Sequence, residues 1–155
     1  MKILFIADVF GAPGRAAVEE RLPGLKDELG VGFCIVNGEN VADGAGITPK
    51  LADKLLAAGA DVLTLGNHVW RRREIGPYLE SSDRVIRPAN LAVGSPGRGL
   101  AVVPPVAVVN LQGILFMTTP VSPFEVLDDL VEQARAQAKI VVVDFHAEAT
   151  SEKVA

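Results

Sequence analysis

Short apolar runs alternate along the chain with stretches that have a helical pattern. The six runs predicted as strands are Lys2–Asp8, Gly32–Gly38, Asp61–Asn67, Arg84–Asn90, Val106–Gly113 and Lys139–Ala147. Most of them are continuously apolar rather than alternating, which is typical of strands that are covered on both faces. Strands that alternate with helices predict an α/β layered fold with a largely parallel sheet.

Two helical segments are predicted in the first half of the chain. One covers residues 14–29 and contains Pro23, which we expect to kink or split it because proline lacks the backbone N–H of a helix interior. The other covers residues 48–59, where a candidate N-cap threonine is followed by proline at the first helical position and the segment ends at a glycine.

A third helix is predicted from Ser122 in the second half of the chain. Proline follows this candidate N-cap, and Glu125 completes the spacing of a capping box. Before it, the density of glycine and proline in residues 90–105 predicts a loop.

Composition narrows the class of protein. The 155 residues suit one domain, and the 49% of hydrophobic residues suffice for a full core. A net charge of −4 and an isoelectric point of about 5.2 argue against a general binder of nucleic acids or anionic membranes. The one cysteine, Cys34, lies in an apolar run, so we expect a buried, inert thiol and no internal disulfide.

The apolar runs do not predict membrane insertion or export. None is long enough to span a bilayer. The N-terminal run is interrupted by Asp8 and no small-residue cleavage site follows it, so we interpret it as a first strand rather than a signal peptide. We therefore expect a cytoplasmic protein with no membrane partner.

Four of the predicted strands end in side chains that can bind metal ions. These are Asp8, then Glu39 and Asn40, then Asn67 and His68, and finally Asp144 and His146. In a parallel sheet the carboxyl ends share one edge, where ligand crevices form, so these residues should converge. Any one of them is explained by a turn or a helix cap, but the four strand ends together favour a site.

The chemistry of this set favours a metal centre. It is rich in oxygen, has few nitrogens and lacks thiolates, which suits Mn or Fe better than a structural Zn site of the thiolate type. A carboxylate can bridge two ions, and Glu39 is the candidate. Two neighbouring ions could activate a water and hold a phosphoryl group during in-line displacement.

His68 has two interpretations that the residues alone leave open. With Asn67 on a metal ion, His68 could face the substrate and donate a proton to a leaving alkoxide. Alternatively, His68 caps the start of a helix and takes no part in chemistry. At this stage the two interpretations have equal weight.

Two other stretches carry weaker signals. The loop in "DVFGAPGR" can present backbone N–H groups to a phosphate, but it is not GxGxxG and lacks the P-loop lysine. A Rossmann-type nucleotide binder is therefore a weak alternative. The three arginines of "WRRREI" are expected on a solvated face, with one guanidinium on a substrate phosphate as the alternative.

Several motifs resemble those of a known family. "GENVADGAGIT", "GNHVW", "RPANL", "NLQG" and "DFHAEATSEK" are similar to the YmdB-like family of bacterial metallophosphoesterases, a branch of the calcineurin-like superfamily, over the whole chain. The resemblance implies a four-layer α/β/β/α sandwich and two divalent metal ions, Fe or Mn foremost and Zn or Mg as alternatives. It further implies hydrolysis of phosphodiester bonds, with 2′,3′-cyclic nucleotides as the characteristic substrates.

The resemblance also implies roles for individual residues. The implied metal ligands are Asp8, Glu39, Asn40, Asn67 and His146, with Glu39 bridging. A hydroxide activated by both metals would attack phosphorus, and His68 would be the general acid. Substrate-binding residues are not assigned, because the chain has "RRR" after "GNHVW" where relatives often carry an acidic residue first.

The chain also departs from the family pattern. Phe10 stands where many calcineurin-like enzymes have a histidine, and the YmdB-like branch also lacks that histidine. The family's later "GTHTH"-like segment, which completes both metal sites, is absent, so we expect residues 1–155 to be one incomplete domain. Such a domain should expose a sheet edge and apolar surface, and we therefore expect it to form homo-oligomers. The alternative to an enzyme is a non-catalytic regulatory or RNA-associated binding module, or an inactive fragment.

Overall fold

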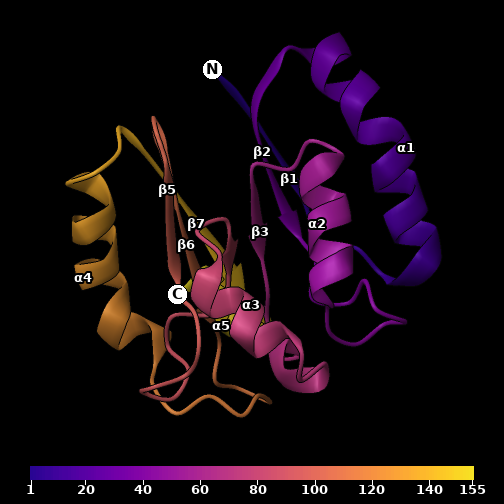
Figure 1. The fold of residues 1–155 in the computed structure, drawn as a ribbon. Coiled ribbons are helices and arrows are strands. Elements are labelled where there is room, and N and C mark those ends of the chain that lie inside the picture. Colours follow the sequence, from indigo (N-terminus) through magenta and orange to yellow (C-terminus); the bar gives the residue numbers. More distant parts are fainter.

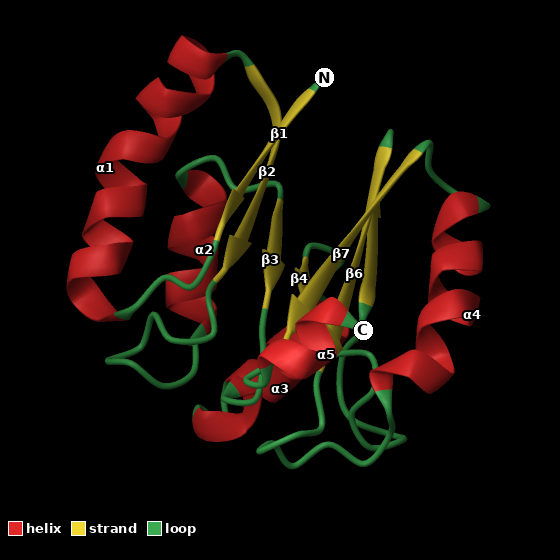
Figure 2. Cartoon of the chain, turned by 180° about the vertical axis from the view of Figure 1, so that it is seen from behind, coloured by secondary structure: helices red, strands yellow, loops and turns green.

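The computed structural model describes all residues from 1 to 155, and its strands form two sheets. The first sheet is parallel and has the order β1-β2-β3-β4, with β1 (Lys2–Ile6), β2 (Val31–Asn37), β3 (Val62–Thr64) and β4 (Val85–Ile86). The second sheet comprises β5 (Leu100–Val103), antiparallel to β6 (Val106–Gln112), and β7 (Ile140–His146), parallel to β6. The carboxyl ends of the parallel strands point to the same end of the molecule (Figures 1 and 2).

Helices cover the outer faces of both sheets. The helical elements of the chain are α1 (Gly11–Leu29), α2 (Pro49–Ala57), the 3-10 turn η1 (Val69–Arg71), α3 (Ile75–Ser81), α4 (Pro123–Arg135) and α5 (Thr150–Val154). The strands β1 to β4 lie side by side in the same order as in the chain, and crossovers between parallel strands are right-handed. The helices between these strands therefore lie on one face of the first sheet. The other face packs on the second sheet, whose outer face is covered by α4, so the expected four-layer α/β/β/α arrangement is confirmed (Figure 1).

Alternation along the strands divides the interior into three cores. On β2, Cys34 and Val36 face the helices, whereas Phe33 and Ile35 face the second sheet. On β6, the same alternation separates the core between the sheets from a third core under α4. Central strands are therefore apolar on both faces, as their continuous runs predict.

The register of the first sheet brings its strand ends to one level. Ile6 pairs with Val36, and Val36 pairs with Leu63. The residues that follow β1, β2 and β3 therefore emerge side by side, which is the geometric basis of the site described below.

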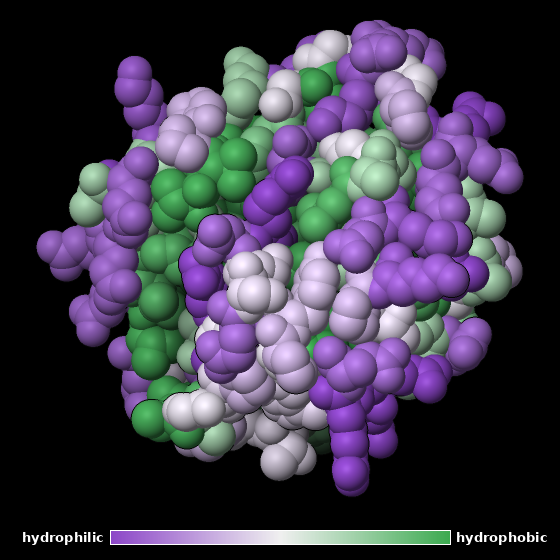
Figure 3. Space-filling view, viewed as in Figure 1, coloured by the Kyte–Doolittle hydropathy of each residue, from purple (hydrophilic) through white to green (hydrophobic).

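The edge strands leave apolar surface exposed. Phe5 on β1 is 42% exposed and Val143 on β7 is 36% exposed, and β7 pairs only with β6. The expectation of a free sheet edge and exposed apolar surface is confirmed, while coverage on both faces is wrong for these two strands. Hydrophobic atoms are also visible at the surface between α4 and the first sheet in Figure 3. Self-association stays a prediction.

Two local predictions, a loop over all of residues 90–105 and a split of the first helix at Pro23, are wrong because contacts distant in sequence decide them. Part of the predicted loop 90–105 forms β5, since it pairs with β6 across Pro104 and Pro105. Pro23 does not split α1, which packs through Val18 and Leu22 on the sheet.

The two predicted helix caps have different outcomes. The hydroxyl of Thr48 accepts a hydrogen bond from the backbone N–H of Leu51 (3.3 Å), as expected. Ser122 is the N-cap of α4, but its side chain makes no capping bond, and the backbone N–H of Glu125 donates to the Ser122 carbonyl instead. The short helices α3 and α5 were not anticipated from the sequence. None of the helices combines the length and apolar composition that a bilayer crossing requires.

The reactivity of the Cys34 thiol reports on the packing between α1 and β2. Its side chain is completely buried, and burial raises the pKa of the thiol to about 11. Since the thiolate is the reactive form, we expect iodoacetamide to leave native protein unmodified at neutral pH and to label one thiol per chain in denaturant, measured by mass spectrometry. Rapid stoichiometric labelling of the native chain would contradict this packing.

Candidate functional site

A cleft of about 910 Å³ opens between the two sheets at the carboxyl ends of their strands. Its polar lining includes Asp8, Asn37, Glu39, Asn40, Asn67, His68, Asp144 and His146. All six residues expected to act in the site, five as metal ligands and one as acid, are therefore brought together. They come from the ends of β1, β2, β3 and β7, as the shared edge of parallel strands predicts.

The position of the cleft follows from the side-chain alternation. Ile140 and Val142 on β7 point into the core between the sheets, and two and four residues further on Asp144 and His146 continue that face. Asn37 does the same on β2 after Phe33 and Ile35. The same faces that build the inter-sheet core therefore become polar where the cleft opens.

Glu39 lies at the centre of the polar cluster. Its side chain is only 2% exposed, yet both carboxylate oxygens have donors. The backbone N–H of His68 donates to Oε2 (3.1 Å), while Nδ2 of Asn40 (3.2 Å) and Nε2 of His146 (3.1 Å) contact Oε1. Burial alone would raise the pKa of Glu39, but the hydrogen bond and charge of His146, with the His68 N–H, hold it below its usual value.

His146 is held by two acceptors. Its Nε2 lies 3.1 Å from Glu39 Oε1 and 3.0 Å from Asn67 Oδ1, so Nε2 carries a proton. Burial alone would lower the pKa of His146, but the hydrogen bond and charge of Glu39, with the charges of Asp144 and Asp8, raise it. A cation bound at Nε2 would replace this proton.

Asn40 links Asp8 to His68. Its Nδ2 donates to both carboxylate oxygens of Asp8 (3.0 Å each), and its Oδ1 lies 2.6 Å from Nδ1 of His68. Because an amide oxygen only accepts, Nδ1 of His68 must carry the proton. The neutral ring therefore has an unprotonated Nε2, and His68 can donate a proton from Nε2 only as imidazolium.

The side chain of His68 does not cap a helix. His68 occupies the N-cap position of η1, but its side chain makes no capping hydrogen bond. The imidazole instead borders the cleft and contacts Asn40, with 28% of the side chain exposed. Its position is therefore compatible with a group that exchanges protons with a bound molecule.

Behind the cluster, Asp144, one of the predicted strand-end residues, forms a buried pair with Asn37, which was not predicted as part of the site. Asn37 donates through Nδ2 to Asp144 Oδ2 (3.4 Å), and its Oδ1 accepts from the backbone N–H of Glu39 (3.3 Å). This pair joins β2 to β7 and so links Glu39 to the strand that carries His146. Burial raises the pKa of Asp144. The sequence signal was the appearance of polar residues at the ends of otherwise apolar runs.

One further motif residue shapes the cleft from outside it. The carboxylate of Glu152 accepts from the backbone N–H groups of Ile114 (2.8 Å) and Leu115 (3.2 Å). It thereby holds the loop of residues 113–119, whose Phe116 and Met117 line the cleft. Sequence reasoning did not identify this role, because the partners of Glu152 are 38 and 37 residues away in the chain.

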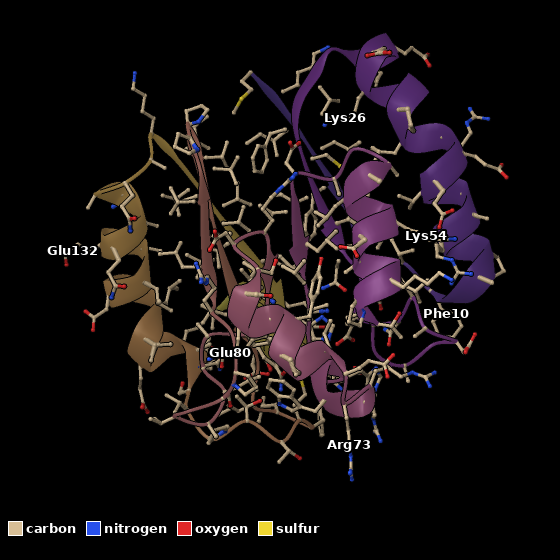
Figure 4. The ribbon with its side chains drawn as sticks, viewed as in Figure 1. Phe10, Lys26, Lys54, Arg73, Glu80 and Glu132 are labelled. Atoms are coloured by element: carbon tan, nitrogen blue, oxygen red, sulfur yellow. The ribbon has the colours of Figure 1, made fainter.

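The three arginines after Trp70 do not line the cleft. Arg72 donates to the carbonyl of Ala42 (3.0 Å) and lies 3.5 Å from a carboxylate oxygen of Asp43, so it anchors the loop after β2. Arg71 and Arg73 are exposed, and Figure 4 shows Arg73 directed away from the fold. The expectation of a mainly solvated face is confirmed.

The donor set fits hard or borderline divalent cations. Two carboxylates, two amide oxygens and one imidazole are the ligand types such ions accept. No three His, Cys, Asp or Glu side chains form a metal-binding group by themselves, so an ion here would also need the amides of Asn40 and Asn67. Gly66 allows the donors to approach, since a Cβ at this position would overlap the Glu39 carboxylate and the His146 ring.

Gly66→Ala should therefore disrupt the cluster. We expect a loss of about 1–3 kcal/mol in the free energy of unfolding, because the added methyl overlaps buried groups that cannot easily move. Gly24→Ala is the matched control, since nothing lies within 4 Å of a Cβ at this position in α1. The control should be up to about 1 kcal/mol more stable than the wild type in chemical denaturation. Equal stability of both variants would contradict the crowding at Gly66.

The Glu39–His146 pair predicts that the stability of the protein, measured in the presence of a metal chelator, depends on pH. The pKa of His146 is raised in the folded state, so its contribution to the free energy of unfolding is complete below the usual pKa of 6.5. This contribution is lost as the pH rises through the folded-state pKa. The pKa of Glu39 is lowered, so its contribution is complete above the usual pKa of 4.5 and is lost as the pH falls through the folded-state pKa. Thermal unfolding should therefore show His146→Gln most destabilised, relative to wild type, between these two values. A difference that does not change with pH would contradict the pairing.

Comparisons with known proteins agree with the fold. A family model described as "YmdB-like protein" matches residues 4–155. The chain is 44% identical over 159 residues to a 2′,3′-cyclic-nucleotide 2′-phosphodiesterase of Bacillus subtilis, a match that covers 100% of this chain and 60% of that protein. The chain thus spans about 60% of the length of this relative.

Solved structures share the fold. A hypothetical protein from Thermus thermophilus superposes with a TM-score of 0.89 at 40% identity, over 99% of this chain and 61% of that one. A structure described as a novel phosphatase, from Mycoplasma pneumoniae, gives a TM-score of 0.87 at 32% identity, over 99% of this chain and 58% of that one. Both similarities include the two-sheet arrangement that builds the cleft, since they cover nearly the whole chain.

Proposed function

Since the chain belongs to the YmdB-like family, we propose that it acts as a metal-dependent phosphodiesterase on 2′,3′-cyclic nucleotides. The observation that carries the proposal is the convergence of the strand-end carboxylates, amides and histidines in one cleft between the sheets. The name of the Bacillus subtilis relative, a 2′,3′-cyclic-nucleotide 2′-phosphodiesterase, supports the substrate class.

Five side chains of the cleft would hold two divalent ions, with Fe or Mn as the first candidates. They are Asp8, Glu39, Asn40, Asn67 and His146. Glu39 is the bridging candidate, because its two oxygens lie between the groups contributed by β3 and those contributed by β7. When bound, the ions supply Lewis-acid polarisation of the phosphoryl oxygens and an activated water.

Binding of cations would change the hydrogen bonds of the chain itself. The proton on Nε2 of His146 must leave before this nitrogen can act as a ligand. The amide of Asn40 can keep its nitrogen on Asp8, because its Oδ1 accepts from Nδ1 of His68 and still has a second lone pair for a cation. The change at His146 follows from the rule that a cation needs a lone pair where the cluster now has an N–H donor.

His68 would supply the proton for the leaving group. Its Nδ1 is held by Asn40, so the ring keeps one orientation and Nε2 is free to face a bound phosphodiester. As imidazolium, it would donate from Nε2 to the alkoxide oxygen of ribose that leaves phosphorus. The backbone N–H of His68 also binds Glu39, which couples the position of the acid to the metal cluster.

The test combines metal analysis with hydrolysis of 2′,3′-cyclic AMP. We expect bound Fe or Mn in the wild-type chain, lost together with activity in Asp8→Ala. His68→Ala should keep the metal but lower kcat by roughly 10²–10⁴-fold, the usual contribution of a general acid. Asp27→Ala, at an exposed position on α1, is the matched control and should change neither quantity.

The outcomes separate the two hypotheses about function. Unchanged turnover in His68→Ala would exclude the acid role. A chain that binds no divalent ion and cleaves no phosphodiester would favour a non-catalytic binding module. Metal bound equally by wild type and Asp8→Ala would exclude the assigned ligand set.

A further inference from the structure

A second cavity, of about 390 Å³, lies directly beside the cleft. Asn67 lines both spaces, so the two share a wall at the end of β3. The loop of residues 113–119 also borders both, with Met117 on the cleft and Thr118 and Thr119 on the cavity. A molecule with its phosphate near His68 could therefore extend past Asn67 into the cavity.

The cavity has an aromatic wall. Trp70 lines it together with Leu91 and Ala92, and this residue is 40% exposed. A large apolar ring left partly in water provides a surface on which another flat ring can stack. The volume falls at the small end of the range of about 300–1,000 Å³ typical of ligand pockets.

One of the residues that line the cavity carries a buried acceptor without a partner. Gln112 is only 1% exposed, and its Oε1 has no hydrogen-bond donor. The orientation of this amide is determined by its neighbour: Thr119 donates its hydroxyl proton to the carbonyl of Gly113 (2.8 Å) and so can only accept from Nε2 of Gln112 (2.6 Å). Oε1 is therefore left for a donor from elsewhere, and a buried acceptor without one is costly.

We propose that the cavity between Trp70 and Gln112 binds the base of a nucleotide whose phosphate occupies the cleft, an inference that rests on the proposed function. The base stacks on the indole of Trp70. A ring N–H or an exocyclic amine of the base donates to Gln112 Oε1. Thr118 also lines the cavity, and its hydroxyl provides a further polar contact.

A binding experiment tests this site without any need for catalysis. Trp70 is the single tryptophan of the chain, so its fluorescence reports on the cavity directly. Titration of the metal-free chain with adenosine should change the emission saturably, and Asp8→Ala should bind adenosine as well as wild type does. Ribose 2,3-cyclic phosphate, which has no base, should leave the emission unchanged.

A matched pair of variants locates the binding. Ala92→Phe fills the cavity from its exposed rim and should weaken adenosine binding by about tenfold or more, the size of a lost base–aromatic stack. Val93→Phe adds the same ring at the next residue, which is fully exposed and does not line the cavity, and should not change the affinity. No saturable response to adenosine, or equal weakening by both variants, would overturn the proposal.

Kinetics then separate this inference from the proposed function. If the chain cleaves phosphodiesters, Ala92→Phe should lower kcat/KM for 2′,3′-cyclic AMP but not for ribose 2,3-cyclic phosphate. An equal loss on both substrates would overturn the base site and leave the phosphodiesterase intact. Adenosine binding at Trp70 without any phosphodiester cleavage would overturn the proposed function and leave the base site intact.

Discussion

Glu39 keeps a carboxylate almost entirely away from water, and a charge in that position is stable only if donors surround its oxygens. The donors are Asn40, the backbone of His68 and the ring of His146, which belong to three separate parts of the chain. The loops after β2 and β3 and the end of β7 must therefore come together before the charge is satisfied. This requirement couples the two sheets at the end where the cleft opens.

The order of the strands determines where that coupling occurs. All helices between β1 and β4 lie on one side of the first sheet, so its other face is free to pack on the second sheet. The packing is apolar along most of its length and becomes polar only beyond Phe33, Ile35 and Val142. Within this polar end, the Asn37–Asp144 pair bridges the sheets behind Glu39.

The loops add the features that would select a ligand. Glu152 on α5 holds the loop of residues 113–119 through two backbone N–H groups, and this loop forms part of both the cleft and the neighbouring cavity. The side-chain amide of Asn90 donates to the backbone carbonyl of Gln112 and accepts from the backbone N–H of Gln112. The motif residues outside the cluster thus place the walls around it.

The sequence by itself determined the alternating elements, the burial of Cys34 and the set of strand-end residues that form the polar cluster, because apolar runs and turn chemistry are local signals. Strand β5 and the intact α1 depend on contacts distant in sequence. Only the tertiary structure decided that His68 contacts Asn40 instead of capping η1, and that Trp70 and Gln112 line one cavity. These arrangements depend on how two sheets pack, and no local pattern of residues encodes the distance between them.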